Sequence, residues 1–168
     1  MYSKVKIFGH PIHPMLVAYP IAMYTATMVA FCIKAAVKGP FWIKVAIATN
    51  VAGVGMAVVA AVPGFIDWAF GIPRGVRAKT TGLRHMLFNL AALALFAVTL
   101  VMYISHWNGP FKVNVWPAIV LSAFGVLCTI AAGFFGWTLV QNHHVGVNVA
   151  GDHAPVRTES PSRFRRAS

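Results

Sequence analysis

Four long stretches of apolar residues, separated by short polar segments, dominate the chain. They cover about residues 14–37, 41–69, 83–106 and 116–140. Each exceeds the roughly 18–20 residues that an α-helix needs to cross the hydrocarbon core of a bilayer. We therefore predict an all-α integral membrane protein, a four-transmembrane-helix bundle with up-down-up-down topology.

Proline, glycine and threonine predict how the spans end and bend. Pro20 falls inside the first span and should kink it, and Pro63-Gly64 should bend or break the last turns of the second. Thr80 or Thr81 is suited to cap the third span. The five tryptophans all lie near predicted span ends, where this ring prefers the membrane interface: Trp42, Trp68, Trp107, Trp116 and Trp137.

The composition supports a membrane protein, since 58% of the residues are hydrophobic and only 10% are charged. A net charge of +11 in a soluble chain would suggest nucleic acid. Here the basic residues flank apolar spans, so anionic lipid is the expected partner and nucleic acid is not. We expect one membrane domain over residues 1–147 and a disordered polar and basic tail over residues 148–168.

The distribution of Lys and Arg predicts an orientation. Ten of these residues lie at the membrane face that includes both termini, four of them in the tail, and four lie at the other face. The positive-inside rule then places both termini in the cytoplasm, in the inner membrane of a bacterium.

Five histidines are predicted to gather at one face of the membrane. The segment His10-Pro-Ile-His13-Pro14 precedes the first span, His85 opens the third, and His143-His144 follows the fourth. With four spans of alternating direction, all of these positions lie at the same end of the bundle. An imidazole can ligate a metal or haem iron, carry a proton or pair with a carboxylate.

Other polar residues are predicted at the same end. Asp67 and Trp68 end the second span, and Asn89 lies one helical turn beyond His85. A carboxylate near bilayer depth needs a partner because its insertion costs energy. Three arginines share this face: Arg74, Arg77 and Arg84. A plainer interpretation is that these side chains cap helices and anchor loops at head-group level.

Several segments together resemble a known family. They are Gly9-His-Pro-Ile-His-Pro-Met-Leu-Val17, Gly64-Phe-Ile-Asp-Trp68, Arg77 through His85 to Asn89, and Gly136-Trp-Thr-Leu-Val140 with His143. The chain is similar to the bacterial four-helix membrane family known as domain of unknown function 2231. Some members of that family are joined to Rieske-type or cytochrome c-type domains, which implies a link to electron transfer. This chain itself has no Rieske ligand pattern and no CxxCH motif.

The leading functional hypothesis is a b-type haem at the histidine end of the bundle. His13 or His10 would face His85 or His143 as axial ligands from different helices. The propionates would bind Arg74, Arg77 and Arg84. Asp67 would accept the second N–H of a ligating histidine, with Trp68 and Asn89 nearby. A redox protein or a quinone would then be the electron-transfer partner.

Two alternatives stay open. One is a non-haem site in which His10, His13, His85 and His143 bind iron, copper or zinc, with Asp67 beside them. The other is a non-catalytic accessory subunit whose polar cluster docks a partner in an oligomer or a larger membrane complex. No hydrolase motif is present, so we do not expect an enzyme in the chain by itself. No internal repeat is evident.

Overall fold

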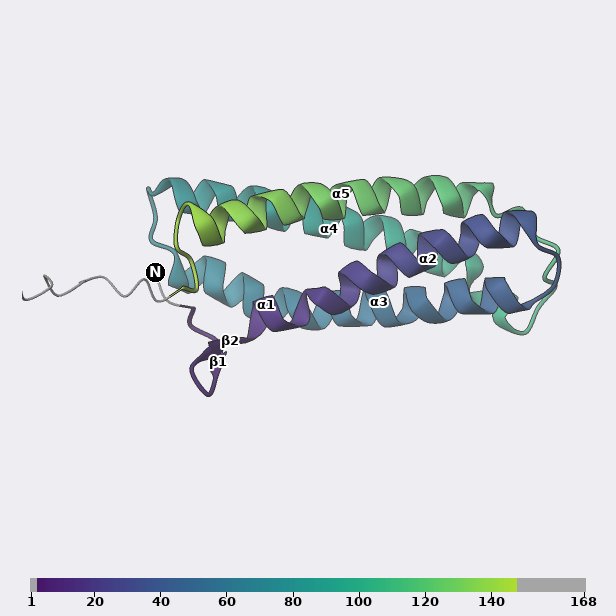
Figure 1. The fold of residues 1–168 in the computed structure, drawn as a ribbon, viewed down its shortest axis with the longest axis horizontal. Helices are drawn as coiled ribbons and strands as arrows, with labels where there is room; N and C mark the ends of the chain where they lie inside the picture. The colour runs from purple at the N-terminus through teal and green to yellow at the C-terminus, as the bar shows by residue number, and fades with distance from the viewer. Residues whose placement is uncertain (1–2, 148–168) are drawn as a thin grey trace, which may run out of the picture.

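The computed structural model describes residues 3–147. Four helical segments in this range are long enough to cross a membrane. They are α1 (Ile12–Leu16) with α2 (Ala18–Ala36), α3 (Phe41–Ile66) with the π-helical turn η1 (Asp67–Gly71), α4 (Arg77–Tyr103) with the 3-10 turn η2 (Ile104–Trp107), and α5 (Trp116–Gln141). Figure 1 shows them side by side along one long axis. The predicted all-α, four-span fold is confirmed. The tail predicted over residues 148–168 lies outside the described residues.

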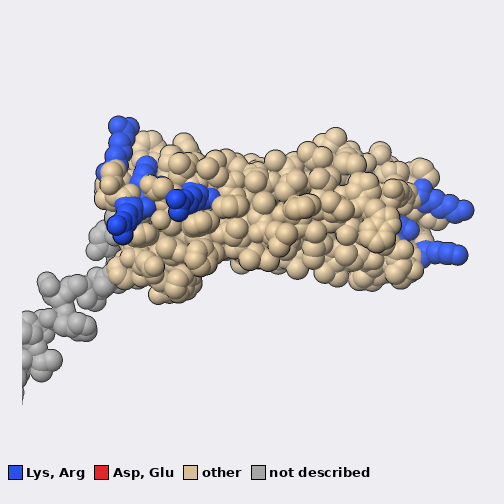
Figure 2. All heavy atoms as spheres, turned by 90° about the horizontal axis from the view of Figure 1, so that it is seen from above, with Lys and Arg blue, Asp and Glu red and all other residues tan. Residues whose placement is uncertain are grey.

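The surface is divided as a bilayer requires. Each segment is long and apolar enough to cross a membrane, with 25 to 31 residues. On the face drawn in Figure 2, Lys and Arg gather at the two ends and leave a broad band between them uncharged. Large apolar side chains of α5 point out of that band, among them Phe124, Leu127 and Phe134. Hydrogen bonds within each helix satisfy the backbone there, so lipid can contact it.

The helices pack as a closed ring of four. α2 packs against α3 and α5, and α4 packs against α5 and α3. Tyr24 of α2 and Phe96 of α4 meet in the centre as a parallel stack, with ring centroids 3.8 Å apart and planes at 1°. Phe31 and Tyr103 form a second aromatic pair at 5.2 Å, nearer the opposite end. The core therefore joins the two diagonal helices through aromatic rings.

The start of the third span differs from the prediction. α4 begins at Arg77 rather than near residue 83, and its N-cap, Val76, makes no side-chain cap bond. The prediction that Thr80 or Thr81 caps this helix is therefore wrong. Thr81 instead donates its hydroxyl to the Arg77 carbonyl within the helix at 3.2 Å. The basic first turn can extend the helix because it lies at the membrane interface rather than in the apolar core.

The prolines act at the first span more than at the second. The helix is interrupted at Val17, between α1 and α2, since Pro20 has no N–H to offer the carbonyl one turn before it. α3 by contrast continues through Pro63 to Ile66, so the chain does not break there. It widens only afterwards, in the π-helical turn over Asp67–Gly71. Both irregularities lie toward the histidine end.

A small hairpin precedes the first span. β1 (Lys6–Ile7) pairs antiparallel with β2 (His10–Pro11), with Lys6 opposite Pro11 and Ile7 opposite His10. Phe8 and Gly9 form the turn, with φ of 48° and 82°. Figure 1 shows this hairpin projecting sideways from the histidine end of the bundle.

Close helix packing at Gly53 gives a first prediction. A Cβ on Gly53 would lie 2.8 Å from Tyr24 Cδ1, whereas a Cβ on Gly55, on the same helix, would meet nothing within 4 Å. We expect Gly53→Ala to destabilise the bundle by about 1–3 kcal/mol through overpacking. Gly55→Ala should be neutral or slightly stabilising, because alanine favours helix. Thermal unfolding in detergent compares the two, and equal stability of both variants would contradict the packing.

Candidate functional site

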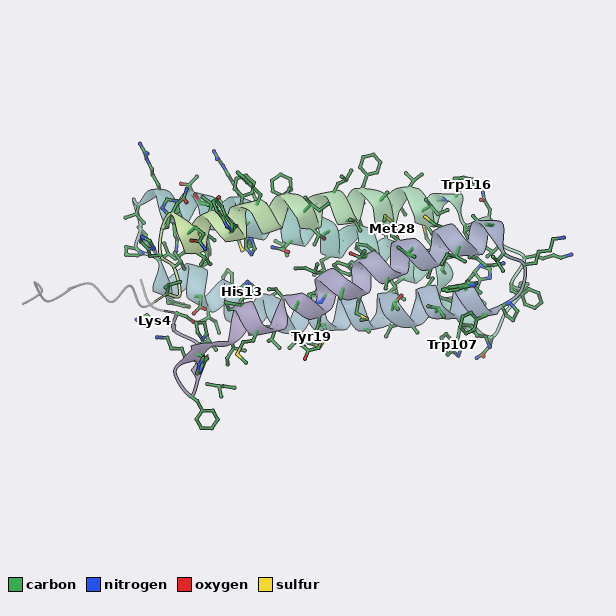
Figure 3. All side chains as sticks on the ribbon, viewed as in Figure 1. Lys4, His13, Tyr19, Met28, Trp107 and Trp116 are labelled. Atoms are coloured by element: carbon green, nitrogen blue, oxygen red, sulfur yellow. The ribbon has the colours of Figure 1, made fainter. Side chains whose placement is uncertain are left out.

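The structure brings two of the predicted histidines together. The ring centroids of His13, in α1, and His85, in α4, lie 6.0 Å apart, with the ring planes at 88°. Figure 3 shows His13 at the end of the bundle where Lys4 also lies, opposite the end marked by Trp107 and Trp116. We call His13 and His85 the histidine pair.

Each ring of the histidine pair is fixed by a backbone carbonyl of a neighbouring helix. Nδ1 of His13 donates to the carbonyl oxygen of Ala60 in α3, and Nδ1 of His85 donates to that of Ala132 in α5, both at 2.8 Å. A carbonyl oxygen only accepts, so each Nδ1 carries the proton when the imidazole is neutral. Nε2 is then the nitrogen with a lone pair, as a metal-binding imidazole requires.

Glycines let these rings lie against the helix backbone. A Cβ on Gly64 would lie 2.7 Å from Nδ1 and Cε1 of His13. A Cβ on Gly136 would lie 3.2 Å and 3.1 Å from the same two atoms of His85. Both glycines follow the accepting alanine by one helical turn. The carbonyl and the gap left by the glycine thus come from one helix face.

The other predicted ligands lie outside this pair. Nδ1 of His10 donates to the Phe8 carbonyl within the hairpin at 2.9 Å. Nε2 of His143 lies 3.4 Å from the Thr81 hydroxyl. Asn89 is closer to the predicted role, since its amide donates to the carbonyl of His85 at 2.9 Å and lies 3.1 Å from Nε2 of the same residue. In the neutral tautomer this nitrogen accepts from Asn89.

Asp67 has partners different from the one predicted. Its carboxylate accepts from the Ser3 hydroxyl at 2.6 Å, from the Lys4 amide at 2.6 Å and from the Val5 amide at 3.1 Å. The carbonyls of Ala60 and Ala132 take the histidine N–H groups that Asp67 was expected to accept. The carboxylate therefore ties the N-terminal segment to the end of the second span.

The prediction missed Lys79, which closes the end of the second span together with Trp68. The Lys79 ammonium donates to the carbonyls of Trp68, Ala69 and Ile72, the last two at 3.2 Å, and it lies 4.2 Å from the Trp68 ring centroid. The Trp68 indole donates back to the Lys79 carbonyl at 3.1 Å. A cation at a helix C-terminus satisfies carbonyls that have no helical donor. In the sequence Lys79 is one of several basic residues between the second and third predicted spans, and nothing in that pattern indicates this role.

The three predicted arginines are all exposed in the described chain. Arg84 lies with its guanidinium carbon 6.0 Å from the ring centroid of Phe135. Arg74 belongs to the loop before α4, and Arg77 is the first residue of that helix. They supply positive charge at the end of the bundle that holds the histidine pair.

Metal-ligating side chains do not cluster beyond the pair. Among residues 3–147, no group of three or more His, Cys, Asp or Glu is close enough to hold one ion. Cys32 and Cys128 are both free thiols. A hollow of about 510 Å³ lies at the opposite end, lined by Lys34, Lys112 and Trp116 among others, and is remote from the histidine pair.

Comparison with known proteins places the chain in a family. A family model described as a predicted membrane protein (DUF2231) matches residues 9–149. The chain belongs to this family. The match includes both histidines of the pair and both accepting alanines. No curated protein and no solved structure matches the chain significantly.

The contacts of Asp67 give a second prediction. Asp67→Leu removes three hydrogen bonds to residues 3–5, two of them from backbone amides to a charged acceptor, which are stronger than neutral ones. We expect trypsin cleavage after Lys4 and Lys6 to accelerate by at least about tenfold, since the loss exceeds roughly 1.4 kcal/mol. Mass spectrometry of timed digests measures the rate. Ser3→Ala removes one bond and should have a smaller effect, and an unchanged rate in Asp67→Leu would contradict the anchoring role.

Proposed function

We propose that this protein is a membrane-embedded redox protein that binds b-type haem through His13 and His85. The observation that carries the proposal is the histidine pair itself. Two imidazoles from different spans face one another at 6.0 Å, and each is held by a 2.8 Å bond from Nδ1. Haem iron takes two axial imidazoles from facing helices of a bundle.

The number of ligands favours haem over a free metal ion. A structural zinc site takes four protein ligands and a catalytic one takes three. Within residues 3–147 the pair has no third His, Cys, Asp or Glu beside it. Haem brings four nitrogens of its own, so two imidazoles complete its coordination.

The spacing of the rings is also suitable. Two imidazoles that bind one ion through bonds of about 2.0–2.1 Å hold their ring centres roughly 6 Å apart. The observed centroid distance is 6.0 Å. The hydrogen bonds to Ala60 and Ala132 would fix the ring orientations and raise the basicity of the ligating nitrogens.

The surroundings supply the remaining chemistry. Gly64 of α3 and Gly136 of α5 let the two rings lie close against these helices. Arg74, Arg77 and Arg84 lie at the same end, where they can bind the propionates of the macrocycle. Bound haem would carry one electron at a time, and a quinone or a redox protein would be the partner. The bacterial inner membrane, with the histidine end in the cytoplasm, is the setting we propose from the distribution of Lys and Arg.

The histidine pair gives the third prediction. Single variants His13→Ala and His85→Ala should lose the Soret absorbance of protein purified from cells supplied with a haem precursor, since each removes one axial ligand. His10→Ala and His143→Ala should keep it, because these rings bond elsewhere in the structure. Size-exclusion elution and thermal unfolding would confirm that all four variants are folded.

Different outcomes separate the competing hypotheses. A parent protein that binds no haem but contains stoichiometric iron, copper or zinc, lost in the His13→Ala, His85→Ala double variant, would replace haem by a non-haem site. A parent protein with neither haem nor metal would leave the accessory-subunit role.

The glycine beside His13 gives the fourth prediction. A Cβ at Gly64 would meet the His13 ring at 2.7 Å, so Gly64→Ala must displace the ring or the helix. We expect haem affinity to fall by about 10–100-fold, as when an outer-shell support of a ligand is lost. Gly133→Ala is the matched control on α5, where a Cβ meets nothing within 4 Å. Titration of both proteins with hemin measures the difference, and equal affinities would refute it.

A further inference from the structure

The histidine pair has a regularity that extends through the whole bundle. Residues 72 positions apart make the same contacts. His13 and His85 differ by 72, as do their acceptors, Ala60 and Ala132, and both bonds are 2.8 Å long. The glycines beside the rings, Gly64 and Gly136, have the same offset.

The offset holds at the bundle centre. Tyr24 and Phe96, which stack on one another, are 72 residues apart. A Cβ on Gly53 would meet Tyr24 at 2.8 Å, and a Cβ on Gly125 would meet Phe96 at 2.5 Å. Again the two glycines differ by 72, so one helix–helix contact occurs twice.

Further equivalent positions continue the pattern toward the opposite end. Thr27 and Thr99 are both fully buried, and each donates its hydroxyl to the carbonyl four residues earlier at 2.8 Å. Phe31 and Tyr103, the second aromatic pair, also have the offset. When residues 13–66 are placed over residues 85–138 without gaps, ten positions carry the same residue. That level of identity is too low to be evident without the contacts.

The packing order gives the symmetry. The offset takes α2 onto α4 and α3 onto α5, and each contact between helices has its counterpart: α2 with α3 matches α4 with α5, and α2 with α5 matches α4 with α3. Such an exchange corresponds to a two-fold rotation about the long axis of the bundle. Each pair, α2 with α3 and α4 with α5, crosses the membrane twice, so both pairs begin at the same membrane face. Repeats in this parallel orientation are related by an axis along the membrane normal.

We propose that the chain is a tandem duplication of a two-span hairpin, and that its ligand site is the interface between the copies, where each supplies one equivalent imidazole to a single metal centre. The identity of that centre as haem iron rests on the proposed function, whereas the duplication does not. Neither copy holds the site alone, since each has one histidine of the pair.

Several polar residues at this end are present in only one of the two copies. Asp67 corresponds to Leu139, Asn89 to Val17 and His10 to Gly82, so none of these three belongs to the symmetric site. The two buried polar atoms that have no partner in the described chain, Tyr24 Oη and Asn50 Oδ1, also lie where the copies differ. Their counterparts are Phe96 and Ser122.

An exchange of equivalent residues in the full-length protein tests the duplication. Asn50 donates its amide to the Phe96 carbonyl across the two copies at 3.2 Å. In the double variant Asn50→Ser, Ser122→Asn, the two-fold relation predicts that the new amide donates to the Tyr24 carbonyl instead. We expect the melting temperature of this variant to stay within about 3 °C of the parent, a shift that corresponds to roughly one hydrogen bond in a chain of this size.

The matched control places the asparagine at a position that is not equivalent. Ala118 is fully buried on α5, one turn before Ser122. Asn50→Ser, Ala118→Asn should melt roughly 5 °C or more below the exchange variant, because the amide has no partner there. An exchange variant that melts as low as the control, or that does not fold, would overturn the duplication.

A second measurement addresses the shared ligand. His13→Ala and His85→Ala, after purification with supplied precursor, should both lose their haem, since equivalent ligands make equivalent contributions. A variant that retains full haem would overturn the shared site. Absence of haem from the parent would refute the proposed function, and the melting temperatures of the exchange variants would still decide the duplication.

Discussion

A polar ring that is partly buried in a membrane bundle needs a hydrogen-bond partner, because lipid and apolar side chains offer none. His13 and His85 meet this constraint in the same way, each through Nδ1 on a helix carbonyl. To reach the carbonyl of Ala60 or Ala132, the imidazole must lie against the helix that carries it. A side chain one turn further on would occupy the same space, so glycine is required there. The need for glycine at positions 64 and 136, and the assignment of the lone pair to Nε2 of each ring, follow from this one interaction.

The remaining polar residues of this end stabilise what surrounds the pair. Asp67 holds residues 3–5 against the end of the second span, and Lys79 caps the carbonyls of the same turn. These contacts fix the segment that leads into α1, and therefore the position of His13. The aromatic stack of Tyr24 and Phe96 fills the core at the bundle centre. The bundle thus combines a tightly packed centre with an end whose polar side chains are held by hydrogen bonds.

Much of the fold follows from the sequence, because span length and the absence of charge are local properties of the chain. The same counting places His13, His85 and Asp67 at one end. It does not give their partners, since those depend on which helix faces approach one another. Asp67 was expected to accept from a histidine, but the amides of residues 4 and 5 are its partners. Lys79 and the duplicated contacts are also set by tertiary packing, so no local pattern reveals them.

The most direct test of the histidine pair as a two-ligand centre is the low-temperature electron paramagnetic resonance spectrum of the oxidised protein, loaded with haem to one equivalent. Two axial imidazoles give low-spin ferric iron, and we expect that signal in the parent. In His13→Ala or His85→Ala, loaded with added hemin to the same haem content, we expect a high-spin signal instead. A parent protein that shows only the high-spin signal, or the same low-spin signal after removal of either histidine, would contradict the shared coordination by His13 and His85.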